Sequence, residues 1–378
     1  MGLGLVPTLA LGAEGPGSPR PPDEPHQTFQ AQAFGLGARS YWLFEPDGPR
    51  PERAPVVVFL HGWLAYNPAV YGAWIEHLAR RGAIVIFPRY QGDWTTRPED
   101  FLPNALTAIR DALDVLQTAP GRVRPDPGRF ALIGHSAGGN LAVQLAAIAA
   151  EPAQGLSRPK AVVCVLPGEL KAIREPDLGR IPAETLLVVV AAEHDWVVGD
   201  YRARQIFAEA TAIPPARKEF VLYRTDRHGP TPLIADHLAP TAALTRLDTG
   251  EGPFRQFQLS RAERNVLDRY GFWRLADLTL EAAFAGLTLD EATDQGAAFR
   301  DLGRWGDGVP VTPPLGGDNL AAIPRVFPPN GARLIPWNPT EFLKRLSGET
   351  LARPSEHAAA PAGLGSRLSA AVPGRSAP

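Results

Sequence analysis

The apolar residues of this chain gather in short continuous runs between about residue 55 and residue 223. The runs are rich in Val, Ile and Leu, and Gly or Pro bounds most of them, which is typical of strands buried on both faces. They predict strands at residues 55–62, 83–88, 129–134, 161–166, 185–192 and 219–223.

The stretches between these runs repeat their apolar residues at helical spacing. In residues 102–117, for example, Leu106, Ile109 and Leu113 share one face. Strands that alternate with helices predict βαβ units and a doubly wound, mostly parallel sheet of the α/β class. The predicted helices are residues 71–82, 102–117, 140–150, 201–210 and, with a break at Gly271, 263–286.

The ends of the chain differ in composition from the central domain, which we place at residues 26–290. Residues 1–25 combine an apolar stretch, small residues near Ala13 and a Pro-rich linker, and so resemble a truncated secretory signal peptide. This favours a secreted or periplasmic protein; the alternative is a disordered tail on a cytoplasmic protein. Residues 291–352 predict an irregular C-terminal extension, and residues 353–378 a disordered tail.

Charge and cysteine content exclude several kinds of partner. The formal net charge is −2 and no basic stripe stands out, which argues against nucleic acid. No stretch approaches the ~18 apolar residues of a membrane span, so no transmembrane segment is expected. The single cysteine, Cys164, lies in the apolar run "AVVCVL", which predicts a small buried side chain rather than a disulfide or a metal ligand. We expect neither a metal nor an organic cofactor.

The segment "LIGHSAGGN" places Ser136 between a predicted strand and a predicted helix. The pattern G-x-S-x-G is weak alone, but this strand–turn–helix context favours a nucleophile held on a sharp turn. Gly134 and Gly138 provide the space that such a turn needs. The alternative is a Gly-rich turn that only packs the helix on the strand.

A serine hydroxyl needs a base and an acid to become a nucleophile. His228 follows the last predicted strand in "EFVLYRTDRHG", and we assign it as the base; His237 lies further from the strand end, and the other histidines fit less well. Asp195, in the loop of "AAEHDWVV", is the acid because the expected order is Ser, Asp, His. The alternative acids are Glu193 and Asp200.

An oxyanion needs two backbone N–H donors. We expect them from Ala137, the residue after the nucleophile, and from Trp63, which follows "HG" after an early strand. The alternative is that "HG" is only a tight turn and that Trp63 belongs to the core. Residues that follow strand ends could line a substrate pocket. Besides Trp63, these are Trp94, Glu169 and Trp196.

The motifs "HGW", "GHSAGG", "AAEHDWVV" and "RHG" occur in an order that resembles the α/β-hydrolase family over roughly residues 30–290. Within this family, the chain looks like the dienelactone hydrolase, polyester hydrolase and acetylhydrolase-like branch. It implies an α/β-hydrolase fold without a large lid. The segment 230–262 is longer than a minimal hydrolase carries and could shape the pocket mouth.

The motifs and the resemblance together predict a serine hydrolase that cleaves a small-molecule or polymeric carboxylic ester through an acyl-enzyme. Amide, peptide or thioester hydrolysis and acyl transfer to an alcohol are alternatives on the same residues. The alternative from another class is a non-catalytic binding protein on the hydrolase fold, because fold alone does not decide function.

Overall fold

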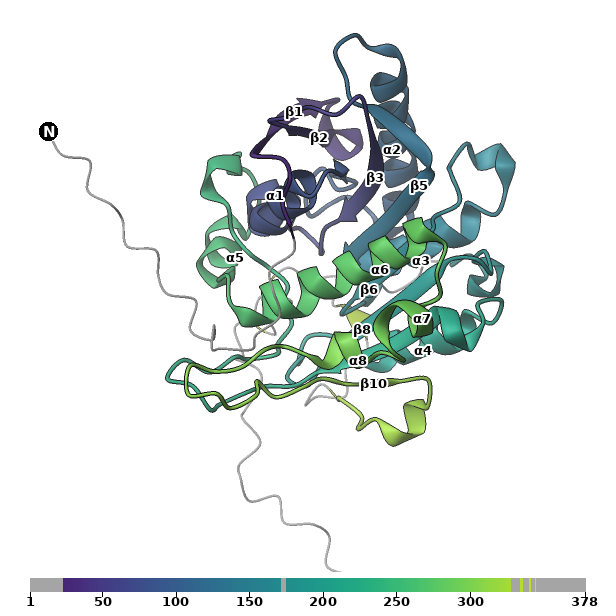
Figure 1. The fold of residues 1–378 in the computed structure, drawn as a ribbon. Coiled ribbons are helices and arrows are strands. Elements are labelled where there is room, and N and C mark those ends of the chain that lie inside the picture. The colour runs from purple at the N-terminus through teal and green to yellow at the C-terminus, as the bar shows by residue number, and fades with distance from the viewer. Residues whose placement is uncertain (1–22, 171–174, 328–333, 336–339, 341–343, 345–378) are drawn as a thin grey trace, which may run out of the picture.

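The computed structural model describes residues 23–170, 175–327, 334–335, 340 and 344, and its centre is a nine-stranded sheet (Figure 1). The strand order is β1-β2-β4-β3-β5-β6-β8-β9-β10. The strands are β1 (Thr28–Phe34), β2 (Tyr41–Asp47), β3 (Arg53–Leu60), β4 (Ile84–Pro88), β5 (Arg124–His135), β6 (Ala161–Val165), β8 (Leu186–Ala192), β9 (Lys218–Tyr223) and β10 (Leu315–Gly317).

The six strands from β4 to β9 in this order are parallel, as the continuous apolar runs predict. Their side chains are buried on both faces of the sheet because a crossover connection of a parallel pair places helices against it. Antiparallel strands close both edges, with β1 and β2 on one side and β10 on the other. The carboxyl ends of the parallel strands therefore meet at one edge of the sheet, where the candidate chemistry lies.

Helices cover both faces of the sheet. Val56, Val58 and Leu60 of β3 pack in a core with α2, α3 and α4, whereas Val57 and Phe59 pack in a second core with α1 and α6. This alternation follows from the two-residue period of a strand. The helices are α1 (Gly72–Arg80), α2 (Phe101–Thr118), α3 (Ala137–Ile148), α4 (Tyr201–Glu209), α5 (Arg255–Arg261), α6 (Arg274–Ala285), α7 (Leu289–Thr293) and α8 (Ala297–Arg300).

Several elements differ from the expectations, among them an edge strand and a helix; the short elements α5, α7, α8 and β10 were also not expected. Strand β1 was not predicted, because it lies at the edge of the sheet and most of its side chains are exposed. The predicted helix 263–286 is a π-helical segment, Leu267–Trp273, that continues into α6. Its Gly271 packs close to the Tyr223 ring, so the extra turn width occurs where a glycine allows close approach of an aromatic side chain.

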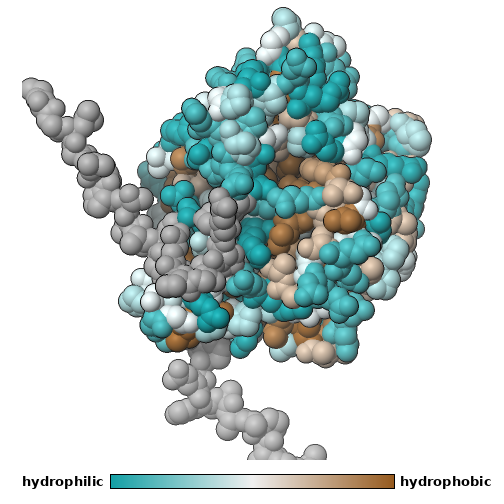
Figure 2. All heavy atoms as spheres, in the orientation of Figure 1, coloured by the Kyte–Doolittle hydropathy of each residue, from teal (hydrophilic) through white to brown (hydrophobic). Residues whose placement is uncertain are grey.

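The segment after α6 wraps around the far edge of the sheet. It forms α7 and α8 and then β10, which pairs with β9. A second, two-stranded sheet joins β7 (Glu169–Leu170) to β11 (Leu334–Ile335). In the orientation of Figure 1, most of the outer surface is hydrophilic and apolar residues gather in one hollowed area (Figure 2). The predicted signal-like region up to residue 22 and the predicted tail 353–378 lie outside the described residues.

Candidate active site

Ser136 occupies the sharp turn that the sequence predicts. Strand β5 ends at His135 and helix α3 begins at Ala137, so Ser136 alone joins them. Its backbone has φ 57° and ψ −121°, a conformation that is strained for a residue with a side chain. A Cβ atom on Gly134 would collide with the Gly138 carbonyl, and one on Gly138 would collide with the carbonyl oxygen of Leu60. Both glycines are therefore required by close backbone contacts.

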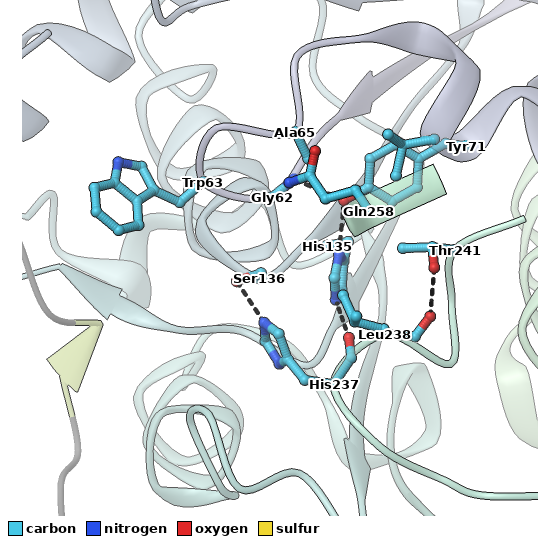
Figure 3. A pocket seen from close by; sticks show the side chains of 11 residues that line it. Gly62, Trp63, Ala65, Tyr71, His135, Ser136, His237, Leu238, Thr241 and Gln258 are labelled. Atoms are coloured by element: carbon cyan, nitrogen blue, oxygen red, sulfur yellow. Dashed lines mark hydrogen bonds between the residues drawn. The ribbon is translucent and has the colours of Figure 1, made fainter. Parts of the chain in front are cut away.

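The imidazole beside Ser136 belongs to His237. The distance from His237 Nε2 to Ser136 Oγ is 3.0 Å, and the distance from His237 Nδ1 to Asp195 Oδ2 is 2.8 Å. Because the ionised carboxylate only accepts, we assign the Nδ1 proton as a donor to Asp195, which leaves Nε2 to accept from the serine hydroxyl. The three side chains thus form one hydrogen-bonded line, and all are buried. Figure 3 shows Ser136 and His237 facing each other.

Asp195 is held rigidly in the loop that follows β8. Its Oδ1 accepts hydrogen bonds from the backbone N–H groups of Val197 and Val198, both at 3.0 Å, while Oδ2 accepts from His237. Both oxygens of this fully buried carboxylate are therefore satisfied. The structure thus brings Asp195 to the imidazole of His237, whereas the sequence analysis paired it with His228. Glu193 instead accepts from the Thr225 backbone N–H, and Asp200 pairs with Arg204.

The assignment of His228 as the partner of Ser136 is wrong. Its Nε2 lies 2.6 Å from Asp307 Oδ2 in the C-terminal extension, and 43% of its side chain is exposed. The reason is the path of the chain after β9. Residues 224–235 make an excursion in which Asp226 pairs with Leu233, and only then does the chain return to the sheet edge at His237.

The sequence does contain a signal that favours His237, but the longer distance of His237 from the end of the strand argued against it. His228 stands in the polar stretch "RTDRHGPTP", whereas His237 stands in "PLIADHL", where apolar residues predict burial. The structure confirms that Leu233 and Ala235 are buried. The backbone N–H of His194 donates to the Ala235 carbonyl at 2.9 Å, which ties this segment to the loop carrying Asp195.

A second line of hydrogen bonds passes behind Ser136. His135 Nε2 lies 2.9 Å from the His237 carbonyl oxygen, and His135 Nδ1 lies 2.8 Å from the Tyr71 hydroxyl. The same hydroxyl accepts from the Gly62 backbone N–H at 2.9 Å. Neutral His135 satisfies every contact if Nε2 donates and Nδ1 accepts. Burial lowers the pKa of His135 well below its usual value, and the charge of His237 adds to this effect.

This second line connects the segments that would have to stay aligned for a reaction at Ser136. Tyr71 lies in the 3₁₀ turn before α1, Gly62 in the loop after β3, and His135 at the end of β5. Burial also raises the pKa of Tyr71, so its hydroxyl keeps the proton that it donates. The contacts therefore fix the Gly62 loop relative to the His237 backbone.

The loop that carries Trp63 is anchored by its neighbours. The Leu64 backbone N–H donates to Gln91 Oε1 at 2.8 Å, and His61 stacks on Tyr90 with ring centroids 4.1 Å apart. Burial lowers the pKa of His61 to about 4. Ala137 is the first residue of α3, where backbone N–H groups point out of the helix. That the N–H groups of Trp63 and Ala137 bind an oxyanion stays a prediction.

A small pocket opens beside Ser136 (Figure 3). It has about 290 Å³ of empty space, part of which is open to solvent, so the enclosed space is small. Its wall is mainly apolar, with a few polar groups at fixed positions. The lining residues are Gly62, Trp63, Ala65, Val70, Tyr71, His135, Ser136, His237, Leu238, Thr241 and Gln258.

Of the residues expected to bind substrate, only Trp63 lines this pocket. Trp94 lies in the loop after β4 with 56% of its surface exposed. Glu169 borders a separate open groove beside α4. Trp196 is half-buried and packs edge-on against the His194 ring. The segment after 230 does shape the pocket, because it supplies Leu238, Thr241 and Gln258.

Comparison with known proteins agrees with this architecture. Residues 57–222 match a family model described as the alpha/beta hydrolase fold. The chain contains an alpha/beta-hydrolase domain. The matched segment includes Trp63, Ser136, Ala137 and Asp195 but ends before His237, so the α/β-hydrolase match itself does not choose between the two histidines. No curated protein matches the chain.

The α/β-hydrolase match supports hydrolase activity, although it specifies no substrate. Among the described residues, no three His, Cys, Asp or Glu side chains are grouped in a way that could hold a metal ion. Over the same part of the chain, every helix is too short or too polar to cross a bilayer.

Proposed function

We propose that the protein is a serine hydrolase that cleaves carboxylic esters through an acyl-enzyme, with Ser136, His237 and Asp195 as its catalytic residues. The observation that carries this proposal is the unbroken hydrogen-bonded line from Ser136 Oγ through His237 to Asp195. A hydroxyl, a base and an orienting carboxylate in that sequence form the arrangement that activates a serine. The strained turn at Ser136 supports the same conclusion.

In the first half of the proposed reaction, Ser136 Oγ attacks the ester carbonyl and its proton passes to His237 Nε2. Asp195 stabilises the imidazolium that forms, because its Oδ2 faces Nδ1. The ester C–O bond then breaks, and the imidazolium gives its proton to the leaving alcohol. Ser136 is left with the acyl group attached.

In the second half, water attacks the acyl-enzyme while His237 accepts the water proton. Collapse of this second tetrahedral intermediate releases the acid and returns the proton to Ser136. The negative oxygen of both intermediates would bind the backbone N–H groups of Trp63 and Ala137. The amino end of α3 adds a favourable dipole at this position.

The experiment that tests the proposal is hydrolysis of p-nitrophenyl esters, from acetate to palmitate, by the wild type and by Ser136→Ala. We expect turnover that requires Ser136 and is fastest for short acyl chains, because the pocket beside Ser136 is small. Turnover of amides or thioesters but not of esters would point to another acyl chemistry on the same residues. Formation of a new ester with an added alcohol would identify an acyltransferase.

Absence of Ser136-dependent turnover on every substrate class would contradict the proposed activity and favour a binding protein. The placement in the dienelactone hydrolase, polyester hydrolase and acetylhydrolase-like branch remains part of the proposal, supported by "HGW" and "GHSAGG". Cleavage of a polyester film by the wild type but not by Ser136→Ala would support an open, polymer-binding site, which the small pocket disfavours.

We also propose export, on the basis of the signal-like segment before Ala13. Mass spectrometry of the protein from its host would test this. A mature N-terminus near Glu14 supports processing, whereas an intact Met1 contradicts it.

A further inference from the structure

The pocket beside Ser136 is closed on one side by Gln258, a residue of helix α5. Only 4% of the Gln258 surface is exposed, although α5 otherwise lies at the surface with most of its residues exposed or half-buried. Figure 3 shows its carboxamide pointing toward the loop that carries Gly62 and Ala65, beside Tyr71. A long polar side chain thus turns inward, into the space where a substrate of Ser136 would lie.

The Gln258 carboxamide differs from the two hydroxyl groups, besides that of Ser136, that line the same pocket. The Tyr71 hydroxyl is already bonded to Gly62 and His135, and the Thr241 hydroxyl donates to the Leu238 carbonyl at 2.6 Å. Gln258 Oε1, in contrast, is buried and has no hydrogen-bond partner among the described residues. Leaving a buried carbonyl oxygen unpaired is unfavourable, and such an atom calls for an explanation.

We propose that Gln258 selects esters whose acyl part is short and carries a hydroxyl group, an inference that rests on the hydrolase function proposed above. A hydroxyl both donates and accepts, so it can pair with Oε1 and with the amide nitrogen of the same carboxamide. The small volume of the pocket limits the chain between the carbonyl carbon and this hydroxyl. The apolar walls formed by Ala65, Val70 and Leu238 would contact that short chain.

The acyl part, rather than the alcohol, is the part assigned to this pocket. The acyl group stays attached to Ser136 through both halves of the reaction, whereas the alcohol leaves after the first. The pocket opens directly on Ser136 and is bounded by the buried residues Tyr71, Val70 and Gln258, so it suits the group that remains. A polar substrate there would exchange its bonds with water for bonds with the carboxamide.

The test compares pairs of ethyl esters that differ by one hydroxyl: propionate with lactate, and butyrate with β-hydroxybutyrate. We expect that, in at least one of these pairs, the wild-type kcat/KM is at least about tenfold higher for the hydroxylated ester than for the ester without the hydroxyl. In Gln258→Leu, which has similar volume and no polar group, this ratio falls to about one because the apolar ester is hydrolysed as well or better.

The matched control is Gln205→Leu on helix α4. Gln205 Oε1 is also buried without a described partner, but Gln205 borders the separate groove beside α4 and not the pocket of Ser136. Gln205→Leu should keep the wild-type ratio. A second measurement does not depend on turnover: the rise in melting temperature of Ser136→Ala on addition of lactamide or propionamide. Lactamide, which carries the hydroxyl, should give the larger rise. This difference should disappear when Gln258→Leu is added to Ser136→Ala.

Each outcome distinguishes the parts of the proposal. An unchanged ratio in Gln258→Leu, or equal rates of the wild type on both members of each pair, overturns the role of Gln258. A preference for a hydroxyl in the alcohol part, measured with ethylene glycol monoacetate against propyl acetate, overturns the assignment to the acyl part. Loss of all Ser136-dependent ester turnover would instead contradict the hydrolase function, and the thermal shifts would still decide whether Gln258 binds a hydroxyl.

Discussion

Two histidines follow strand β9, and the structure places them in opposite settings. His237 is 3% exposed and lies between Ser136 and Asp195. His228 is largely exposed and pairs with Asp307, a residue of the C-terminal extension. The first is held by buried hydrogen bonds at the sheet edge, and the second sits where two surface segments meet.

This difference in setting shows that the first histidine after β9 in the sequence, His228, is not the one that lies beside Ser136. The excursion of residues 224–235 is stabilised by the extension, whose Trp305 Nε1 and Thr312 N–H donate to Asp226 at 3.1 and 2.7 Å. A Cβ on Gly229 would collide with the Trp305 ring, so the excursion and the extension fit closely. The excursion is thus a packed part of the fold. It makes the connection from β9 to the histidine beside Ser136 longer, while that histidine still lies at the sheet edge.

Exchange of each histidine gives the largest expected effect. His237→Ala should lower kcat on Ser136-dependent substrates by at least about 1,000-fold, because the hydroxyl loses its base. His228→Ala should change kcat by less than about threefold, since the contact of His228 with Asp307 is exposed and lies away from Ser136. Steady-state kinetics on the best p-nitrophenyl ester measures both. A large loss of kcat in His228→Ala, together with near-normal kcat in His237→Ala, would show that His228 and not His237 is the base.

Asp226→Asn tests the structural side of the comparison. The new amide would point a donor at the Trp305 and Thr312 N–H groups, so we expect the free energy of unfolding to fall by about 2–3 kcal/mol. Burial alone would raise the pKa of Asp226, but hydrogen bonds from the N–H groups of His228 and Thr312 and from Trp305 outweigh it, and the pKa is lowered. Urea denaturation measures the loss.

The control for this prediction is Asp307→Asn, which breaks only the exposed pair with His228 and should cost less than about 1 kcal/mol. Well below the melting temperature, both variants should keep nearly the wild-type kcat. A strong loss of kcat in folded Asp226→Asn would show that the excursion positions His237, and the two settings would then not be independent.

Tyr71→Phe probes the hydrogen bonds behind Ser136. It removes the hydroxyl shared by Gly62 and His135, and we expect kcat to fall by about tenfold with little change in KM, because the proposed oxyanion loop loses its alignment. Affinity for a boronic acid that mimics the tetrahedral intermediate should fall in parallel, while affinity for the product acid should not. The control is Tyr223→Phe, because the Tyr223 hydroxyl is buried with no described partner. Equal effects of both variants would contradict a positioning role for Tyr71.

Glu219→Gln has the smallest expected effect on activity and concerns the contact between β9 and the C-terminal extension. Burial raises the pKa of Glu219 from 4.5 to about 7, against the opposing charge of Arg300. The folded state therefore holds this proton more tightly than the unfolded state, and the stability it confers below pH 4.5 is lost as the pH rises through 7. Relative to the wild type, Glu219→Gln should gain about 3 kcal/mol of stability as the pH rises from about 5 to about 8. Melting curves showing a gain independent of pH would contradict this assignment.

The sequence predicts the central strands, the helices on both faces and the turn at Ser136, because continuous apolar runs and glycine spacing report local burial and close contact directly. Asp195 follows from its place after β8. The path from β9 to His237 does not follow, because it depends on contacts of Asp226 with residues about 80 positions away, such as Trp305. Strand β1 was missed because an exposed edge strand has little apolar pattern.

The central claim is that His237 activates Ser136, and the most direct measurement is covalent labelling with a p-nitrophenyl phosphonate. Intact mass and peptide mapping would follow labelling of the wild type, His237→Ala and His228→Ala. The account predicts one phosphonyl group on Ser136, added rapidly to the wild type and to His228→Ala and very slowly to His237→Ala. Rapid labelling of Ser136 in His237→Ala, or slow labelling in His228→Ala, would contradict it.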